Sequence, residues 1–191
     1  YGCVNERRNQ LHEVIRLSGM NLIINDNDHQ LIIKVSSIPS ARIQIYFIDN
    51  DDYFARKAAL TDSEGEEFSD NDERAIFFAR GVLETVKKLR WEPDIIHCQG
   101  WMGAIVPLFV KQAYQDEPTF ANTKIVTSLF DDELKTCVGK DFKKSLAFKT
   151  VNDELLKDYK TDFDFFELQK LAIDYSDAII QAGSEETEAF K

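Results

Sequence analysis

The first 50 residues carry three short runs of β-type side chains, which are Asn21–Ile24, Gln30–Val35 and Ala41–Ile48. Turn-forming residues 25–29, NDNDH, separate the first two runs and predict a β-hairpin. The third run follows the break at Pro39, alternates at first and then becomes continuously apolar. That change is typical of a strand that enters a buried sheet. We therefore predict a hairpin extension over about residues 17–40.

Beyond residue 41, short apolar runs alternate with stretches of helical spacing. Apolar side chains recur at helical spacing from Ile76 to Leu89, after turn formers that suit a helix N-terminus. The elements expected next are a strand at Asp94–Cys98, a helix at Trp101–Tyr114, a strand at Lys124–Leu129, a helix at Phe165–Tyr175, a strand at Ala178–Gln181 and a helix capped by Gly183 and Ser184. This alternation predicts an α/β fold, in which a Rossmann-like parallel sheet has helices on both faces.

The length of 191 residues fits a single domain, 1–191, with a βαβ core over about residues 41–191. The chain starts at Tyr1 and ends at Lys191 inside a helical pattern, so we expect one truncated lobe of a larger enzyme. Lys and Arg number 23 against 34 Asp and Glu, which gives a net charge of −11. That balance argues against a nucleic acid or a membrane surface as a partner.

The three cysteines, Cys3, Cys98 and Cys137, lack the spacing of a metal site or a disulfide framework. We therefore expect no metal and no resident cofactor. Few and unpaired cysteines also predict a reducing, cytoplasmic location.

Ligands of open parallel sheets bind beyond the carboxyl ends of the strands. The most distinctive sequence at such an end is residues 93–104, PDIIHCQGWMGA, where His97 and Gln99 leave a strand and Gly100 permits a tight turn. They are interpreted either as a polar rim for a sugar or nucleotide, or as a core histidine bonded to the backbone. A second candidate group follows the third β-type run and consists of Asp49, Asp51 and Asp52. Paired carboxylates of this kind can act as a general acid and base, but more commonly they form turns and cap helices. No GxGxxG, P-loop or GxSxG motif is present, which argues against dinucleotide, P-loop and α/β-hydrolase chemistry.

Four segments in chain order resemble the N-terminal catalytic domain of bacterial glycogen synthases and plant starch synthases. Residues 46–54, YFIDNDDYF, are similar to YFIDNPEYF, and residues 68–89 are similar to a stretch in which DNAERF opens a helix. Residues 91–104 resemble a strand followed by H-x-HDW, and residues 171–190 resemble ILYADRVTTVSPTYAREI. The order and spacing of the four segments make the resemblance specific.

The resemblance implies a retaining glucosyltransferase with two Rossmann-like domains. Such enzymes move glucose from ADP-glucose, or UDP-glucose, to the non-reducing end of an α-1,4-glucan. The N-terminal domain carries the acceptor side, and the C-terminal nucleotide-sugar domain, absent from this chain, carries most donor contacts. We therefore expect an α-glucan and a nucleotide sugar, ADP-glucose, as ligands, and no activity from this chain alone.

The chain departs from the family's site pattern at two positions. The aspartate of HDW is Gly100, and the family histidine that contacts the transferred sugar is Leu129. The catalytic residues are therefore left unassigned. The predicted substrate-binding residues are His97, Gln99, Gly100, Trp101 and Asp49.

These departures keep open the alternative of a divergent, non-catalytic glucan-binding or regulatory domain. An unrelated Rossmann-like ligand or interaction domain is a third alternative, which requires the resemblance to be accidental. In the family, further strands precede Tyr1, so the sheet is expected to have an open edge. An upstream segment or a neighbouring copy would cover that edge, and the second case makes a homo-oligomer.

Overall fold

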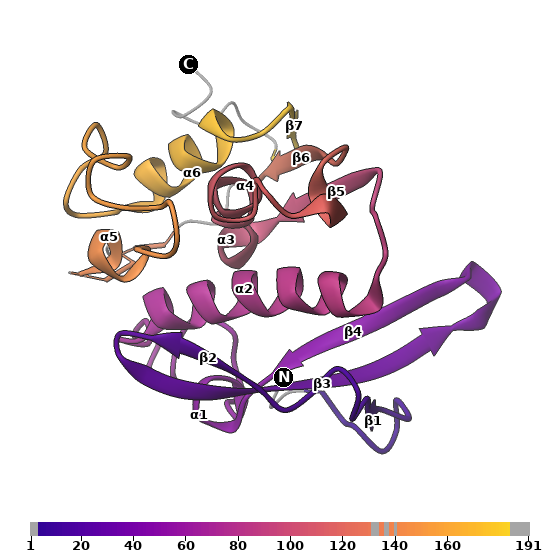
Figure 1. Ribbon diagram of the computed structural model, residues 1–191. Helices are drawn as coiled ribbons and strands as arrows, with labels where there is room; N and C mark the ends of the chain where they lie inside the picture. Colours follow the sequence, from indigo (N-terminus) through magenta and orange to yellow (C-terminus); the bar gives the residue numbers. More distant parts are fainter. Residues whose placement is uncertain (1–3, 131–133, 136–137, 140, 184–191) are drawn as a thin grey trace. The chain divides into compact units, whose positions relative to one another are not determined.

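The computed structural model describes residues 4–130, 134–135, 138–139 and 141–183, which form two compact units, 1–68 and 69–191. The first unit is an antiparallel sheet (Figure 1). Its elements are β1 (His12–Glu13), β2 (Met20–Ile24), β3 (Asn27–Ile38), η1 (Pro39–Ala41), β4 (Ile43–Asp49) and α1 (Asp51–Phe54).

The long strand β3 organises the first unit because all three other strands pair with it. Asn25 and Asp26, both at positive φ, make the two-residue turn between β2 and β3, as a twisted hairpin requires. The predicted hairpin is therefore confirmed, although β3 extends further than the expected strand. Alternate residues Leu31, Ile33 and Val35 are buried.

The second unit contains a parallel three-stranded sheet with its strands in the order β5-β6-β7. The sheet and its helices α3, α4 and α6 lie together in Figure 1. The elements are α2 (Asn71–Leu89), β5 (Ile95–Gln99), α3 (Gly100–Gly103), α4 (Val106–Leu108), η2 (Phe109–Ala113), η3 (Pro118–Phe120), β6 (Lys124–Leu129), α5 (Phe142–Ser145), α6 (Phe165–Asp174) and β7 (Ala178–Gln181). The strand and helix positions predicted from residue 71 onward are confirmed to within a residue or two, with one exception.

The exception is the helix expected over 101–114, which is divided into α3, α4 and the π-type turn η2. Pro107 lies at the start of α4 and has no N–H to donate to the preceding turn, which explains the break. The predicted helix starting at Gly183 and Ser184 extends outside the described residues.

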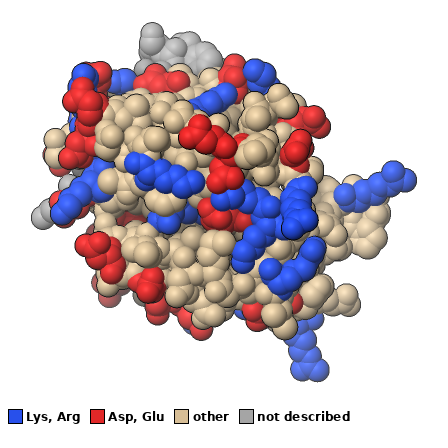
Figure 2. Space-filling model, viewed as in Figure 1, with Lys and Arg blue, Asp and Glu red and all other residues tan. Residues whose placement is uncertain are grey.

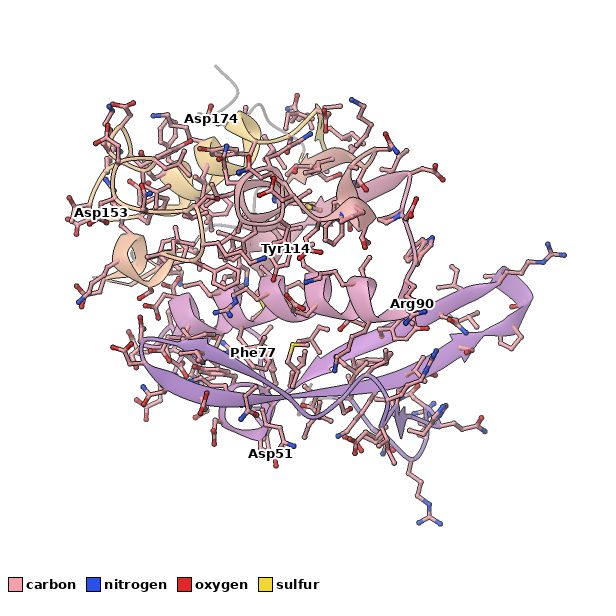
Figure 3. The ribbon with its side chains drawn as sticks, viewed as in Figure 1. Asp51, Phe77, Arg90, Tyr114, Asp153 and Asp174 are labelled. Atoms are coloured by element: carbon pink, nitrogen blue, oxygen red, sulfur yellow. The ribbon has the colours of Figure 1, made fainter. Side chains whose placement is uncertain are left out.

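Helix α2 combines several stabilising features of its sequence. Acids occupy its first turn and lysines its last turn, which suits the helix dipole. Arg90 ends it in the left-handed conformation and donates its N–H to the carbonyl oxygen of Lys87. Tyr114, labelled in Figure 3, points toward α2 and donates to the carboxylate of Glu84 at 2.7 Å.

One expectation about the sheet needs correction, the place of the strand over residues 41–48. Strand β4 pairs antiparallel with β3 in the first unit, so within the described residues the parallel sheet begins at β5. The fold class is the predicted α/β class, a parallel sheet packed with helices, and on one face of this sheet Ile95 and Ile180 are 60% and 47% exposed. The misplacement of β4 arises because strand pairing is a long-range feature, which local hydrophobic patterns do not encode.

Candidate functional site

The candidate site lies where β5 turns into α3 in the second unit. Gln99 ends the strand and Gly100 begins the helix at a φ of +70°, a conformation that L side chains rarely adopt. The turn therefore depends on glycine, and it brings Trp101 to the carboxyl end of the sheet. The predicted residues His97, Gln99, Gly100 and Trp101 are consequently neighbours in space as well as in sequence.

A small cavity of about 20 Å³ opens at this end of β5 and β6. Its apolar walls come from α3, from the end of β6 and the residue after it, and from α6, and they include Trp101, Leu129, Phe130 and Phe165. Leu129, at the position of the family histidine, is only 3% exposed. A volume of about 20 Å³ has room for about one water molecule, so the cavity is a small apolar hollow beside Trp101 that cannot enclose a sugar ring and offers few hydrogen bonds.

Polar groups gather on the open face of the sheet beside this cavity. In the parallel register Gln99 lies opposite Ser128, so His97, Gln99 and Ser128 share one face. His97 Nε2 lies 2.7 Å from Ser128 Oγ, and Gln99 Nε2 lies 3.4 Å from His97 Nδ1. His97 is exposed and bonded to a side chain, so it is not the backbone-bonded core histidine of the alternative interpretation.

Cys98, on the opposite face of β5, offers no reactive group to the site. Cys98 is buried, and desolvation raises the pKa of its thiol to about 12 despite a hydrogen bond to Thr127 that acts the other way. The thiol therefore stays protonated at neutral pH and is a poor nucleophile. Thr127 Oγ1 is also within 2.7 Å of Ser176 Oγ, which ties β6 to the residues before β7.

Sequence reasoning missed Gln169, which reaches the cavity from α6. Its side chain is 6% exposed and donates through Nε2 to the carbonyl oxygen of Phe130 at 3.3 Å. Gln169 thereby holds the backbone that follows β6. Gln169 is one of two polar residues, with Glu167, among the buried residues of α6, and this polarity was the signal that could have indicated it.

Asp49 lies in the first unit, at the end of β4. Its carboxylate is 2.7 Å from Lys34 Nζ, and Lys34 also contacts Glu6 at 2.6 Å. Burial alone would lower the pKa of Lys34, but the bonds to Asp49 and Glu6 outweigh it and raise the pKa above its ordinary value. Asn50 caps α1 by accepting from the N–H groups of Asp52 and Tyr53, so Asp51 and Asp52 belong to a helix start.

The described residues contain no group of three or more His, Cys, Asp or Glu side chains that could hold a metal ion. Among the helices that the structure describes, none is long and apolar enough to cross a membrane. Ser184, predicted to cap a helix, lies outside the described residues.

The parallel sheet and its helices define a Rossmann-like α/β fold, with the candidate site at the carboxyl edge of the sheet. Residues 1–185 match the starch synthase catalytic domain family, and the chain belongs to that family. It is 32% identical over 180 residues to a glycogen synthase of Chlorobaculum parvum, covering 94% of this chain and 36% of that protein. It is 41% identical over 130 residues to a glycogen synthase of Chlorobium luteolum, covering 68% of this chain and 27% of that protein.

A solved structure supports the fold. The catalytic domain of starch synthase IV from Arabidopsis thaliana, bound to ADP and acarbose, superposes with a TM-score of 0.71 at 16% identity. The match covers 94% of this chain and 35% of that chain. The chain therefore spans about a quarter to a third of the length of these relatives.

Proposed function

We propose that the chain is the acceptor-side lobe of a glycogen (starch) synthase. The enzyme would transfer glucose from ADP-glucose to the non-reducing end of an α-1,4-glucan with retention of configuration. The observation that carries the proposal is the β5–Gly100–α3 turn, which brings Trp101 to the carboxyl edge of the sheet in a chain of this family. Relatives named glycogen synthase, and a structural neighbour bound to ADP and acarbose, support the choice of substrates.

The site residues have distinct proposed roles in binding glucan. The half-buried Trp101 offers its ring to the apolar face of a glucose unit. His97, held by Ser128, and Gln99 offer hydrogen bonds to sugar hydroxyls. Asp49 stays a predicted contact, and its pairing with Lys34 means that its charge is already partly neutralised.

Stabilisation of the departing nucleoside diphosphate needs cationic groups, which the described residues do not supply at this cavity. The cavity is apolar, and no Lys or Arg lines it among the described residues. We expect the departing nucleoside diphosphate to be stabilised electrostatically by the second domain of the complete enzyme. The catalytic residues remain unassigned, and the 191-residue chain alone is expected to be inactive.

A divergent, non-catalytic glucan-binding domain is the second candidate. Leu129 favours it because a leucine cannot donate the hydrogen bond of the family histidine. Such a domain would co-sediment with glycogen yet show no transfer in the full-length protein.

The proposal includes a cytoplasmic location and self-association of the isolated chain. The edge of β5 away from β6 has no partner strand in the described residues, and the neighbouring sheet face exposes Ile95 and Ile180. Light scattering of the isolated chain should show a dimer or larger species. Detection of only a monomer at all concentrations would contradict the proposed self-association.

The test of the enzymatic proposal is transfer of labelled glucose from ADP-glucose to glycogen by the full-length protein. We expect elongation of the glucan, and a reduction of about 100-fold or more for Trp101→Ala through poorer positioning of the acceptor. A full-length protein that binds glycogen but transfers glucose from neither ADP-glucose nor UDP-glucose would support the non-catalytic candidate instead.

A further inference from the structure

A second concave surface lies in the first unit, between residues 4–12 and the β3–β4 hairpin. This groove has a volume of about 1090 Å³. We call it the hairpin groove and define it by Arg8, Gln10, His12, Ile38, Ile45 and Phe47, which are among its lining residues. All of its lining residues belong to the first unit, whereas the cavity beside Trp101 is lined only by the second.

One wall of the groove is a turn with its own internal bonds. Asn5 Oδ1 accepts from the backbone N–H of Arg8 at 2.8 Å, and Asn5 O accepts from the side chain of Asn9. Ser36 Oγ on β3 donates to the carbonyl oxygen of Asn9 at 2.8 Å. The ion pair of Glu6 with Lys34 joins the same two segments. These contacts fix the turn against the sheet and give the groove a defined wall.

This wall presents hydrogen-bonding groups that the fold does not use. The side chains of Arg8, Gln10 and His12 are exposed and make no hydrogen bond to another described residue. They supply guanidinium, amide and imidazole groups, which donate to hydroxyl oxygens, while the amide also accepts. The residues that line the groove include no Asp or Glu, although the chain carries 34 of them.

The other wall carries apolar side chains beside Ser36 and Ser37. In the β3–β4 register Ile45 and Phe47 are two residues apart on one face, and Ile38 pairs with Ile43 farther along the same hairpin. Ile38 and Ile45 are 43% and 37% exposed. A wall of apolar side chains facing a wall of neutral and cationic donors matches the two sides of a sugar, its C–H face and its hydroxyl edge.

We propose that the hairpin groove binds a segment of α-glucan as a site additional to the one beside Trp101. The choice of glucan as the ligand rests on the proposed function, whereas the polyhydroxyl chemistry rests on the groove itself. Binding a polysaccharide at two places raises the effective concentration of its chain ends at the second place. The groove would therefore favour glycogen over short maltooligosaccharides as an acceptor.

Native gel electrophoresis of the 191-residue chain in gels that contain glycogen tests the proposal. Glycogen should retard the wild-type chain, and Arg8→Ala combined with Gln10→Ala should weaken the apparent affinity about five-fold or more. Arg7→Ala is the matched control, because it removes the same charge from the neighbouring exposed position that does not line the groove. It should stay within about two-fold of wild type. Thermal unfolding confirms that each variant is folded.

The outcomes separate this inference from the proposed function. Retardation of the double variant equal to that of Arg7→Ala, or no retardation of the wild-type chain, would overturn the groove proposal. In the full-length protein, the double variant should raise the KM for glycogen while the KM for maltohexaose and kcat stay unchanged. In another outcome, the full-length protein transfers glucose to no acceptor and is still retarded by glycogen, with weaker retardation of the double variant. That result would contradict the proposed reaction but support the proposed glucan site in the hairpin groove.

Discussion

At the residue scale, Leu129 decides the character of the cavity beside Trp101. Its side chain is buried among apolar neighbours from α3 and α6. The sequence alone identified this position and Gly100 as departures from the family pattern. It did not indicate Gln169, whose bond to Phe130 connects residues 39 apart in the chain. Such contacts depend on tertiary packing and leave no periodic signal.

Restoring a histidine at position 129 should destabilise the chain. Leu129→His removes apolar burial and adds a polar ring to a site with few hydrogen-bonding groups, which should lower the free energy of unfolding by about 2–4 kcal/mol. Leu129→Met, which preserves apolar volume, should cost less than about 1.5 kcal/mol. Urea unfolding of both variants measures the difference. Equal stability of the two variants would show that the cavity accommodates a polar ring.

Gly139 supports the second unit through its lack of a side chain. A Cβ at this position would lie 2.7 Å from the carboxyl carbon of Asp72 on α2. Asp72 is buried, and desolvation raises the pKa of its carboxyl group. The backbone at 139 therefore packs directly against this side chain.

Gly139→Ala should force Asp72 to move and cost about 1–3 kcal/mol of unfolding free energy. Gly103→Ala is the matched control, because a Cβ there would meet its nearest atoms in Cys98 at an ordinary 3.8 Å. Thermal unfolding should show a lower Tm for the first variant only. Similar Tm values for the two variants would contradict this packing.

At the element scale, the strands of the second unit were located well from sequence because short apolar runs and helical spacing are local signals. The pairing of β4 with β3 was missed because an antiparallel partner cannot be read from alternation within one strand.

Asp177, just before β7, shows how the observed elements are joined. Its carboxylate accepts from Lys111 of η2 at 2.7 Å and from the backbone N–H of Ile125 of β6 at 2.8 Å.

These contacts predict a pH dependence of stability. Lys111 and the Ile125 N–H lower the pKa of Asp177 below its ordinary 3.8. A carboxyl group with a lower pKa in the folded state contributes stability above its unfolded pKa and loses that contribution as the pH falls through the folded value. Asp177→Asn should therefore cost about 1 kcal/mol at pH 7, and the difference from wild type should vanish at strongly acidic pH.

Urea unfolding at several pH values measures this effect, with Asp116→Asn as the control. Asp116 is exposed and has no ion pair among the described residues, so its substitution should matter little at any pH. A cost for Asp177→Asn that is the same at pH 7 and at pH 2 would rule out the ionic contribution.

At the scale of the whole molecule, composition limited the classes of partner but did not identify the site. Acidic and basic side chains are interspersed on the face shown in Figure 2, so the charge of −11 forms no single acidic surface there. The order of four family-like segments carried the assignment of the chain to its family. The hairpin groove could not be predicted, because its walls come from segments more than 20 residues apart.

The central claim is that glucan binds beside Trp101, and the chain contains two tryptophans that can report on it. Trp91 is 59% exposed before β5, whereas Trp101 lines the cavity. Titration of the 191-residue chain with maltoheptaose, followed through the two indole N–H resonances, is the most direct test. We expect a saturable shift of the Trp101 resonance, with Trp91 unchanged as the internal control. A Trp101 resonance that stays fixed at millimolar maltoheptaose, or moves no more than that of Trp91, would contradict the claim.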